Sequence, residues 1–190
     1  MQSKTNAVPS KNEERTPDEK LSSLFKWTRK SEYDILYDSD EMPYDRTHFQ
    51  RVIYGRQNVM GIIITDKGEV FGSFHPKTLP QEEQESDWVN DNNYFVFKIN
   101  DEMCKFKKSE KMNTEWSLYL CNENDYSANN FYCVLSAFGL SCPLNDERSG
   151  MIRRGFSGCY TYDDMLVRGD YDNFHNIFFK PSRLILIQWY

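Results

Sequence analysis

The chain has 190 residues, of which 15% are aromatic, and its formal net charge at pH 7 is −6. This length favours one domain whose core needs no disulfide or metal to hold it together. Aromatic residues favour strands, so the composition indicates a sheet-rich fold. The negative charge disfavours a general nucleic-acid-binding role, which requires a concentrated positive face.

The start of the chain and its cysteines bear on domain organisation and location. Residues 1–15 are polar, which predicts a disordered tail ahead of a single domain over residues 16–190. No apolar leader segment opens the chain, and no apolar run approaches the roughly 20 residues of a membrane-spanning helix. Five cysteines, an odd number, favour reduced thiols. We therefore expect a cytoplasmic location, with the nucleus as the alternative.

The first predicted element is a helix that begins at Pro17. Thr16 is its expected N-cap, and Glu19 completes a capping box. Apolar residues at i, i+3 and i+4, starting from Leu21, form one face. We expect this face to dock on the domain, with a helix that binds a partner's groove as the alternative.

A strand, a short helix and a hairpin follow along the chain. Residues 33–38 alternate between polar and apolar, which predicts a strand. Asp45 is the expected N-cap of the helix, and Gly55 fits its C′ position. The runs 59–65 and 69–75 flank "DKG", which predicts a hairpin whose turn glycine has a positive φ.

The second half of the chain has weaker patterns. We interpret residues 79–93 as an acidic loop and residues 105–111 as an exposed basic turn, and 136–182 shows little periodicity. The closing run 183–190 is nearly all apolar, which predicts a strand covered on both faces. Further strands are expected at 94–99, 116–120 and 131–135. Many strands with two or three short helices predict an α+β fold of packed, mostly antiparallel sheets.

The acidic stretch "ILYDSDEMPYD" invites comparison with a calcium-binding loop. An EF-hand needs oxygen ligands at loop positions 1, 3 and 5, glycine at 6 and glutamate at 12. Counting from Asp38, the pattern fails at Met42, Pro43 and Phe49. We therefore interpret the stretch as a strand-to-helix turn whose oxygens cap backbone N–H groups, with a looser metal site as the alternative.

No other motif selects a metal, a cofactor or a catalytic residue. The cysteines and histidines lack zinc-ligand spacing, and the chain has neither a nucleophile-elbow nor a phosphate-binding glycine motif. We therefore predict no catalytic, cofactor-binding or metal-binding residues. A thiol-redox protein or enzyme is the alternative, with Cys104, Cys142 or Cys159 as the reactive cysteine of a predicted loop.

Two basic stretches, "KFKKSEK" and "MIRRGF", carry an aromatic among cations. Such a pattern can contact nucleic acid through Lys105, Lys107, Lys108, Arg153 and Arg154. We favour a solvated turn and loop instead and keep a DNA-binding regulator as a further alternative.

The order of these elements resembles the TLDc domain family, found in eukaryotic oxidation-resistance proteins. The similarity lies in "ILYDSDEMPYDRTHFQRVIYG", "VMGIIITDKGEVFGSFHP", "DNNYFVFKI" and "RLILIQWY", and "LFKWTRKSEYDILYDSD" looks like a divergent protozoan-type member. The matching signature residues are Trp27, Asp38, Ser39, Asp40, Gly55, Gly68, Phe71, Gly72, Phe95 and Phe97. Ser73 replaces the family's usual second glycine, and Met42-Pro43 replaces its "DG".

The resemblance implies a sandwich of two antiparallel sheets flanked by helices, with no established catalytic mechanism. It also implies a protein-interaction module with a role in resistance to oxidative stress. In some members the domain binds the vacuolar proton-pumping ATPase, so subunits of that pump are the expected partners.

Overall fold

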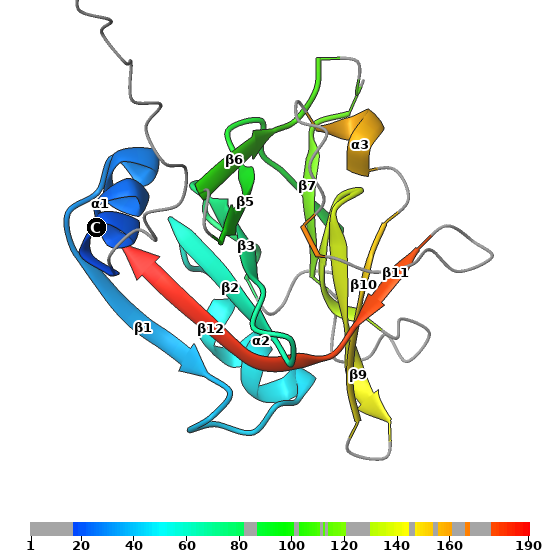
Figure 1. Ribbon diagram of the computed structural model, residues 1–190. Helices are drawn as coiled ribbons and strands as arrows, with labels where there is room; N and C mark the ends of the chain where they lie inside the picture. The colour runs from blue at the N-terminus through cyan, green and yellow to red at the C-terminus, as the bar shows by residue number, and fades with distance from the viewer. Residues whose placement is uncertain are drawn as a thin grey trace, which may run out of the picture.

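A computed structural model describes residues 17–81, 87–100, 103–110, 112, 114–120, 130–144, 147–153, 156–160, 166–167 and 176–190. Two six-stranded sheets pack face to face, and a helix covers the outer face of one of them (Figure 1). This architecture confirms the predicted α+β sandwich. The predicted tail, the Thr16 cap and Arg154 lie outside the described residues, and the division into a tail and one domain stays a prediction.

The first sheet has the strand order β1-β12-β2-β3-β5-β6, and neighbouring strands run antiparallel. Its strands are β1 (Tyr33–Asp38), β2 (Val59–Thr65), β3 (Val70–His75), β5 (Phe95–Ile99), β6 (Met103–Lys107) and β12 (Pro181–Trp189). The C-terminal strand β12 therefore lies inside the sheet, between β1 and β2. Its side chains join the core on one face and the cluster under the N-terminal helix on the other, as its apolar run predicts.

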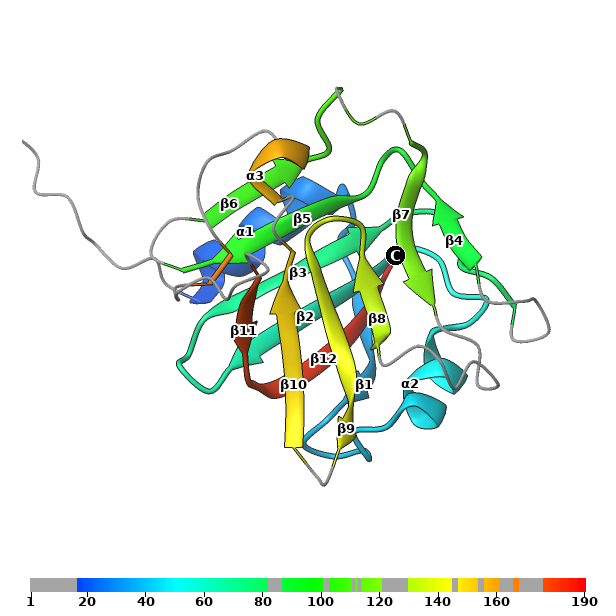
Figure 2. The same ribbon diagram turned by 90° about the vertical axis from the view of Figure 1, so that its right-hand side faces the viewer.

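The second sheet has the strand order β11-β10-β9-β8-β7-β4, and its pairings are also antiparallel. Its strands are β4 (Asp87–Asn90), β7 (Trp116–Leu120), β8 (Asn130–Val134), β9 (Phe138–Leu144), β10 (Glu147–Ile152) and β11 (Ile177–Phe179). Figure 2 shows this sheet in front of the first one. The main core lies between the two sheets and is rich in aromatic side chains.

The described residues include three helices beside the sheets: α1 (Pro17–Thr28), α2 (Arg46–Ile53) and α3 (Phe156–Cys159). Leu24 of α1 is buried against the outer face of the first sheet, and Leu21 and Phe25 pack beside it. The predicted docking of this helix is therefore confirmed. Within the described part of the chain, no helix is both long and apolar enough to span a membrane.

The local signals around α2 and the hairpin are also confirmed. Asp45 caps α2, since its side chain accepts a hydrogen bond from the backbone N–H of His48 at 2.9 Å. Gly55 follows the helix with φ 68°, and Gly68 of the β2–β3 turn has φ 79°. Glycine adopts these left-handed conformations without the steric cost that other residues incur.

Three sequence interpretations are wrong. The stretch expected to be a basic turn contains β6, and the expected acidic loop contains β4. The region 136–182 holds β9, β10, β11 and α3 despite its weak periodicity. As a result, Cys104, Cys142 and Cys159 lie in β6, β9 and α3 rather than in loops. Short strands pair through the backbone, so their side chains need not show a strong pattern.

Candidate functional site

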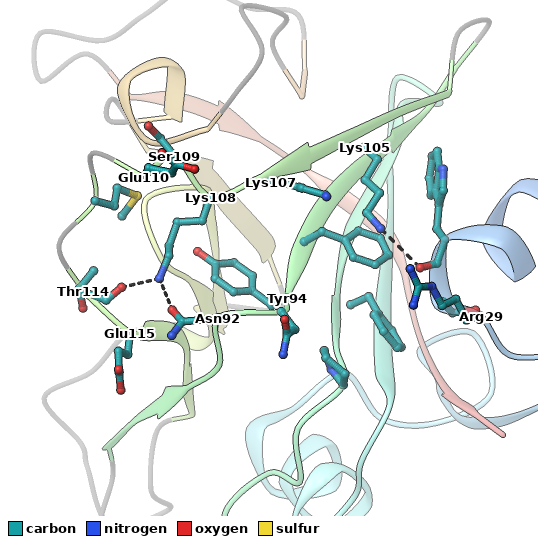
Figure 3. A pocket seen from close by; sticks show the side chains of 17 residues that line it. Arg29, Asn92, Tyr94, Lys105, Lys107, Lys108, Ser109, Glu110, Thr114 and Glu115 are labelled. Atoms are coloured by element: carbon teal, nitrogen blue, oxygen red, sulfur yellow. Dashed lines mark hydrogen bonds between the residues drawn. The ribbon is translucent and has the colours of Figure 1, made fainter.

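An open groove of about 940 Å³ lies where the end of α1 meets the outer face of β5 and β6. Its walls come from segments far apart in sequence: the end of α1, the chain before β5, and the chain from β6 towards β7 (Figure 3). We call it the cationic groove, because Arg29, Lys105, Lys107 and Lys108 line it.

The floor of the groove is aromatic, and Trp27 is the partly exposed ring among its described aromatic residues. Phe74 and Phe95 are buried in the cluster beneath α1, and Trp27 meets Phe95 edge-on with ring centroids 6.2 Å apart. The ammonium of Lys105 lies 3.8 Å above the Phe95 ring, a cation–π arrangement. Its Nζ also donates to the backbone oxygen of Trp27 at 3.4 Å. The lysine therefore joins β6 to the end of α1.

Lys105 and Lys107 lie on the same face of β6 because side chains two residues apart in a strand point the same way. Burial, followed by the neighbouring charges of Lys107 and Arg29, lowers the pKa of Lys105. Lys107 and Arg29 therefore each lie close enough to Lys105 for their positive charges to repel it.

Lys108 has a different role at the other end of the groove. Its Nζ donates to Asn92 Oδ1 at 2.7 Å and to the backbone oxygen of Thr114. These bonds tie together the two loops of that wall. Figure 3 shows Glu110 and Glu115 near this end, away from Arg29 and Lys105. The groove therefore has a cationic end and an end that contains carboxylates.

Arg29 caps α1 in a conformation that usually belongs to glycine. Its φ is 59°, and its backbone N–H donates to the oxygen of Phe25 at 2.8 Å. This is the left-handed C′ cap of a helix. The sequence reasoning missed Arg29, because no motif marks it. The available signal was a helix followed directly by "TRKS", with a cation where a capping glycine is expected.

The structure separates the four predicted nucleic-acid contacts that it describes. Lys105, Lys107 and Lys108 line the groove. Arg153 instead follows β10, where its guanidinium donates to Cys133 Sγ at 3.7 Å, and it does not line the groove. Burial raises the pKa of the Cys133 thiol, which disfavours its reactive thiolate form.

Asp38 and Ser39, two of the signature residues, link the end of β1 to β12 through hydrogen bonds. Asp38 accepts from Arg183 Nε at 2.9 Å and from the backbone N–H of Asp40 at 3.1 Å. Ser39 Oγ accepts from the backbone N–H of Leu184 at 2.9 Å. The hydrogen bond from Arg183 holds the pKa of Asp38 below its usual value. Across the described residues, no group of three or more His, Cys, Asp or Glu side chains is placed to hold a metal.

The remaining signature residues serve packing and local conformation. A Cβ at Gly72 would lie 1.9 Å from the backbone oxygen of Gly61 and 2.8 Å from the Phe97 ring. Phe71 points into the core and contacts Phe138 and Phe179 edge-on. Gly72 is therefore required by the close approach of its neighbours.

Ser73, the departure from the family pattern, takes part in a hydrogen-bond chain between the two sheets. Its Oγ lies 2.7 Å from the hydroxyl of Tyr132 in β8 and 2.9 Å from Nε2 of His75. All three side chains are fully buried, and the His75 ring stacks on Tyr94. A serine beside a histidine resembles an activated nucleophile, but this pair has no exposed surface for a substrate to reach.

Comparison with known proteins bears on these observations. A sequence model of the TLDc domain matches residues 16–134 of the chain, which include α1, most of the first sheet and all the described residues that line the groove. No curated protein matches the chain.

Proposed function

Because the chain belongs to the TLDc domain family, we propose that it is a non-enzymatic protein-interaction module that recruits a partner through the cationic groove. The observation that carries this proposal is the set of three cations, Arg29, Lys105 and Lys107, at an open surface. Among the described residues, none of the three has a carboxylate within salt-bridge distance. Charged groups that have no oppositely charged neighbour within the protein favour recognition of an oppositely charged partner.

The family resemblance supports a more specific form of the proposal. The vacuolar proton-pumping ATPase is the partner that we propose, and resistance to oxidative stress is the process. A cytoplasmic or nuclear location belongs to the same proposal. The described residues that line the groove all lie within the part of the chain that the family model covers.

The test is co-elution of the purified full chain with the purified ATPase. We expect one complex with the wild-type chain and its loss when Arg29 and Lys107 are both replaced by Glu. A matched control is Lys67→Glu, which makes the same kind of charge change at an exposed turn outside the groove. Failure of the wild-type chain to co-elute would overturn the pump as partner.

The wider proposal needs a separate experiment. Crosslinking the chain in its own cells, followed by capture, should recover a specific partner that R29E/K107E loses and that K67E retains. Recovery of the same proteins with the wild-type chain, R29E/K107E and K67E would show that the groove is not the interaction surface. For the stress role, cells that carry R29E/K107E should survive peroxide less well than cells that carry K67E, and equal survival would overturn that role.

A further inference from the structure

The spacing of the cations in the groove limits what can bind there. Lys105 and Lys107 are two residues apart on one face of β6, so their attachment points lie about 6.6 Å apart. Alternate side chains of any extended peptide have the same separation. A strand-like segment lying along β6 could therefore present a carboxylate to each lysine in turn.

The charges in the groove are left uncompensated, although they repel each other. Lys105 lies close to both Arg29 and Lys107, and none of the three has a carboxylate partner among the described residues. The protein as a whole is acidic, with a net charge of −6, so carboxylates are plentiful elsewhere in the chain. An anionic ligand would relieve the repulsion between these cations, which favours its binding.

The backbone of Arg29 supplies a second observation. A residue with a Cβ is disfavoured at φ 59°, and glycine is the usual choice at this cap. An arginine here lowers the stability of the cap and places a guanidinium in the groove. Strained residues of this kind gather where a side chain serves binding rather than folding.

The floor of the groove distinguishes between classes of anionic ligand. Binding of single-stranded nucleic acid relies on exposed aromatic faces on which bases stack. The rings of Phe74, Tyr94 and Phe95 are each less than 5% exposed. Trp27 is partly exposed, so the described lining offers one accessible ring rather than a platform for successive bases. Asn92, whose Oδ1 accepts from Lys108, and Asn93 bring side-chain amides to the wall, and amides suit the N–H and C=O groups of a peptide.

We propose that the cationic groove binds an extended acidic segment of a protein partner, with carboxylates at alternate residues that face Arg29, Lys105 and Lys107. This specification rests on the proposed function as an interaction module. Glu110 and Glu115 repel acidic residues at the far end, so the acidic part of the segment lies towards α1 (Figure 3).

The experiment measures the fluorescence anisotropy of a labelled ten-residue peptide of alternating Ser and Glu, titrated with the full chain. We expect saturable binding that weakens as salt is raised, because salt screens exposed charges. R29E/K107E should raise Kd by about tenfold or more, which corresponds to about 1.4 kcal/mol. K67E should leave Kd unchanged.

Comparison probes test the chemistry and the spacing. A Ser-Gln peptide of the same length should not bind, and a peptide with its five Glu in one block should bind more weakly than the alternating one. Equal binding of the two acidic peptides would overturn the proposed placement of carboxylates at alternate residues. Tighter binding of a ten-nucleotide single strand than of the alternating peptide would overturn the choice of a protein segment.

A second variant guards against misfolding as an explanation. Arg29→Gly removes one cation and suits the left-handed cap, so it should weaken peptide binding without lowering the melting temperature. No saturable binding of the alternating peptide to a folded wild-type chain would overturn the inference. If the groove variants still lose a captured partner in that case, the proposed function stands; if the peptide binds but no partner is captured, the proposed function fails and the groove chemistry stands.

Discussion

Polar side chains serve opposite purposes in the interior of the sandwich and in the cationic groove. Inside, Ser73, His75 and Tyr132 are fully buried and joined by hydrogen bonds that connect the two sheets. In the groove, Arg29 and Lys107 are exposed and, among the described residues, unpaired. Pairing offsets the loss of bonds to water that burial causes, although Nδ1 of His75 has no partner among the described residues. The contrast indicates that the interior maintains the fold and that the groove is available to a ligand.

The largest expected effect comes from crowding the interior. Gly72→Ala would place a Cβ 1.9 Å from the backbone oxygen of Gly61, so the β2–β3 pair must separate or shift. We expect the free energy of unfolding to fall by more than about 3 kcal/mol, at the high end for an overpacked site. Urea unfolding measures this loss. Gly68→Ala is a useful control, since no heavy atom lies within 4 Å of the added Cβ and only the positive φ is strained.

The second prediction concerns the stability of the folded protein as the pH falls. Burial lowers the pKa of His75 from 6.5 to about 3, so the folded state holds the ring neutral while the unfolded chain takes up a proton. Stability is therefore complete above pH 6.5 and declines as the pH falls towards 3. At pH 5 the expected loss is about 2 kcal/mol relative to pH 8.

Melting temperatures from pH 8 to pH 4 test this. His75→Phe should flatten the decline, because phenylalanine can stack on Tyr94 and cannot take up a proton. Tyr132→Phe is the matched control: it removes one hydrogen bond of the chain and keeps the histidine, so its curve should be lower at every pH but equally steep. An unchanged slope in His75→Phe would assign the acid sensitivity to other groups.

Asp38 sharpens the comparison because it is charged like the groove lysines yet paired like the interior side chains. Asp38→Ala removes the partner of Arg183 and the cap of the Asp40 backbone N–H. Arg183 is partly exposed and can be hydrated again, so we expect a loss of about 1–2 kcal/mol. Because the pKa of Asp38 is lowered on folding, the loss should be full above pH 4 and should fade in stronger acid.

The effect of calcium on the melting temperature provides a further test of Asp38→Ala. Since the Asp38 carboxylate already accepts from Arg183 and the backbone, adding Ca²⁺ should not change the melting temperature of the wild-type chain or of Asp38→Ala. Asp40→Ala, which removes an exposed partner of Arg183 at 3.2 Å, should cost less than Asp38→Ala. A calcium-dependent rise in melting temperature that Asp38→Ala abolishes would make the turn a metal site.

These two regions also differ in how far the sequence could predict them. The alternating strand β1, the β2–β3 hairpin around "DKG", and caps with a chemical signature, such as Asp45 and Gly55, follow from local rules and were predicted correctly. The polar link between Ser73 and Tyr132 joins residues 59 positions apart, and no local pattern encodes that distance.

The groove was harder to predict for the same reason. Its walls meet only when α1 docks on the first sheet, so Arg29 and Lys105 are neighbours in the fold but not in the chain. The misinterpretation of β6 has a more specific cause. The stretch "CKFK" does alternate, but Lys105, Lys107 and Lys108 together favoured an exposed turn. The strand keeps Lys105 and Lys107 because its outer face opens onto the groove.

The smallest expected effect has the opposite sign and separates the two regions most sharply. Arg29→Gly relieves the left-handed cap of α1, so we expect the free energy of unfolding to rise by up to about 1 kcal/mol. The gain is reduced because glycine also increases the conformational entropy of the unfolded chain. Thermal and urea unfolding measure it, with Arg29→Ala as the control, which removes the same guanidinium but keeps a Cβ in the strained conformation. If Arg29→Gly is less stable than Arg29→Ala, the cap is not under strain; if both variants are less stable than the wild-type chain, the guanidinium contributes to folding. If Arg29→Gly is more stable than the wild-type chain, the native chain gives up stability at this position, as expected of a residue kept for binding rather than for the fold.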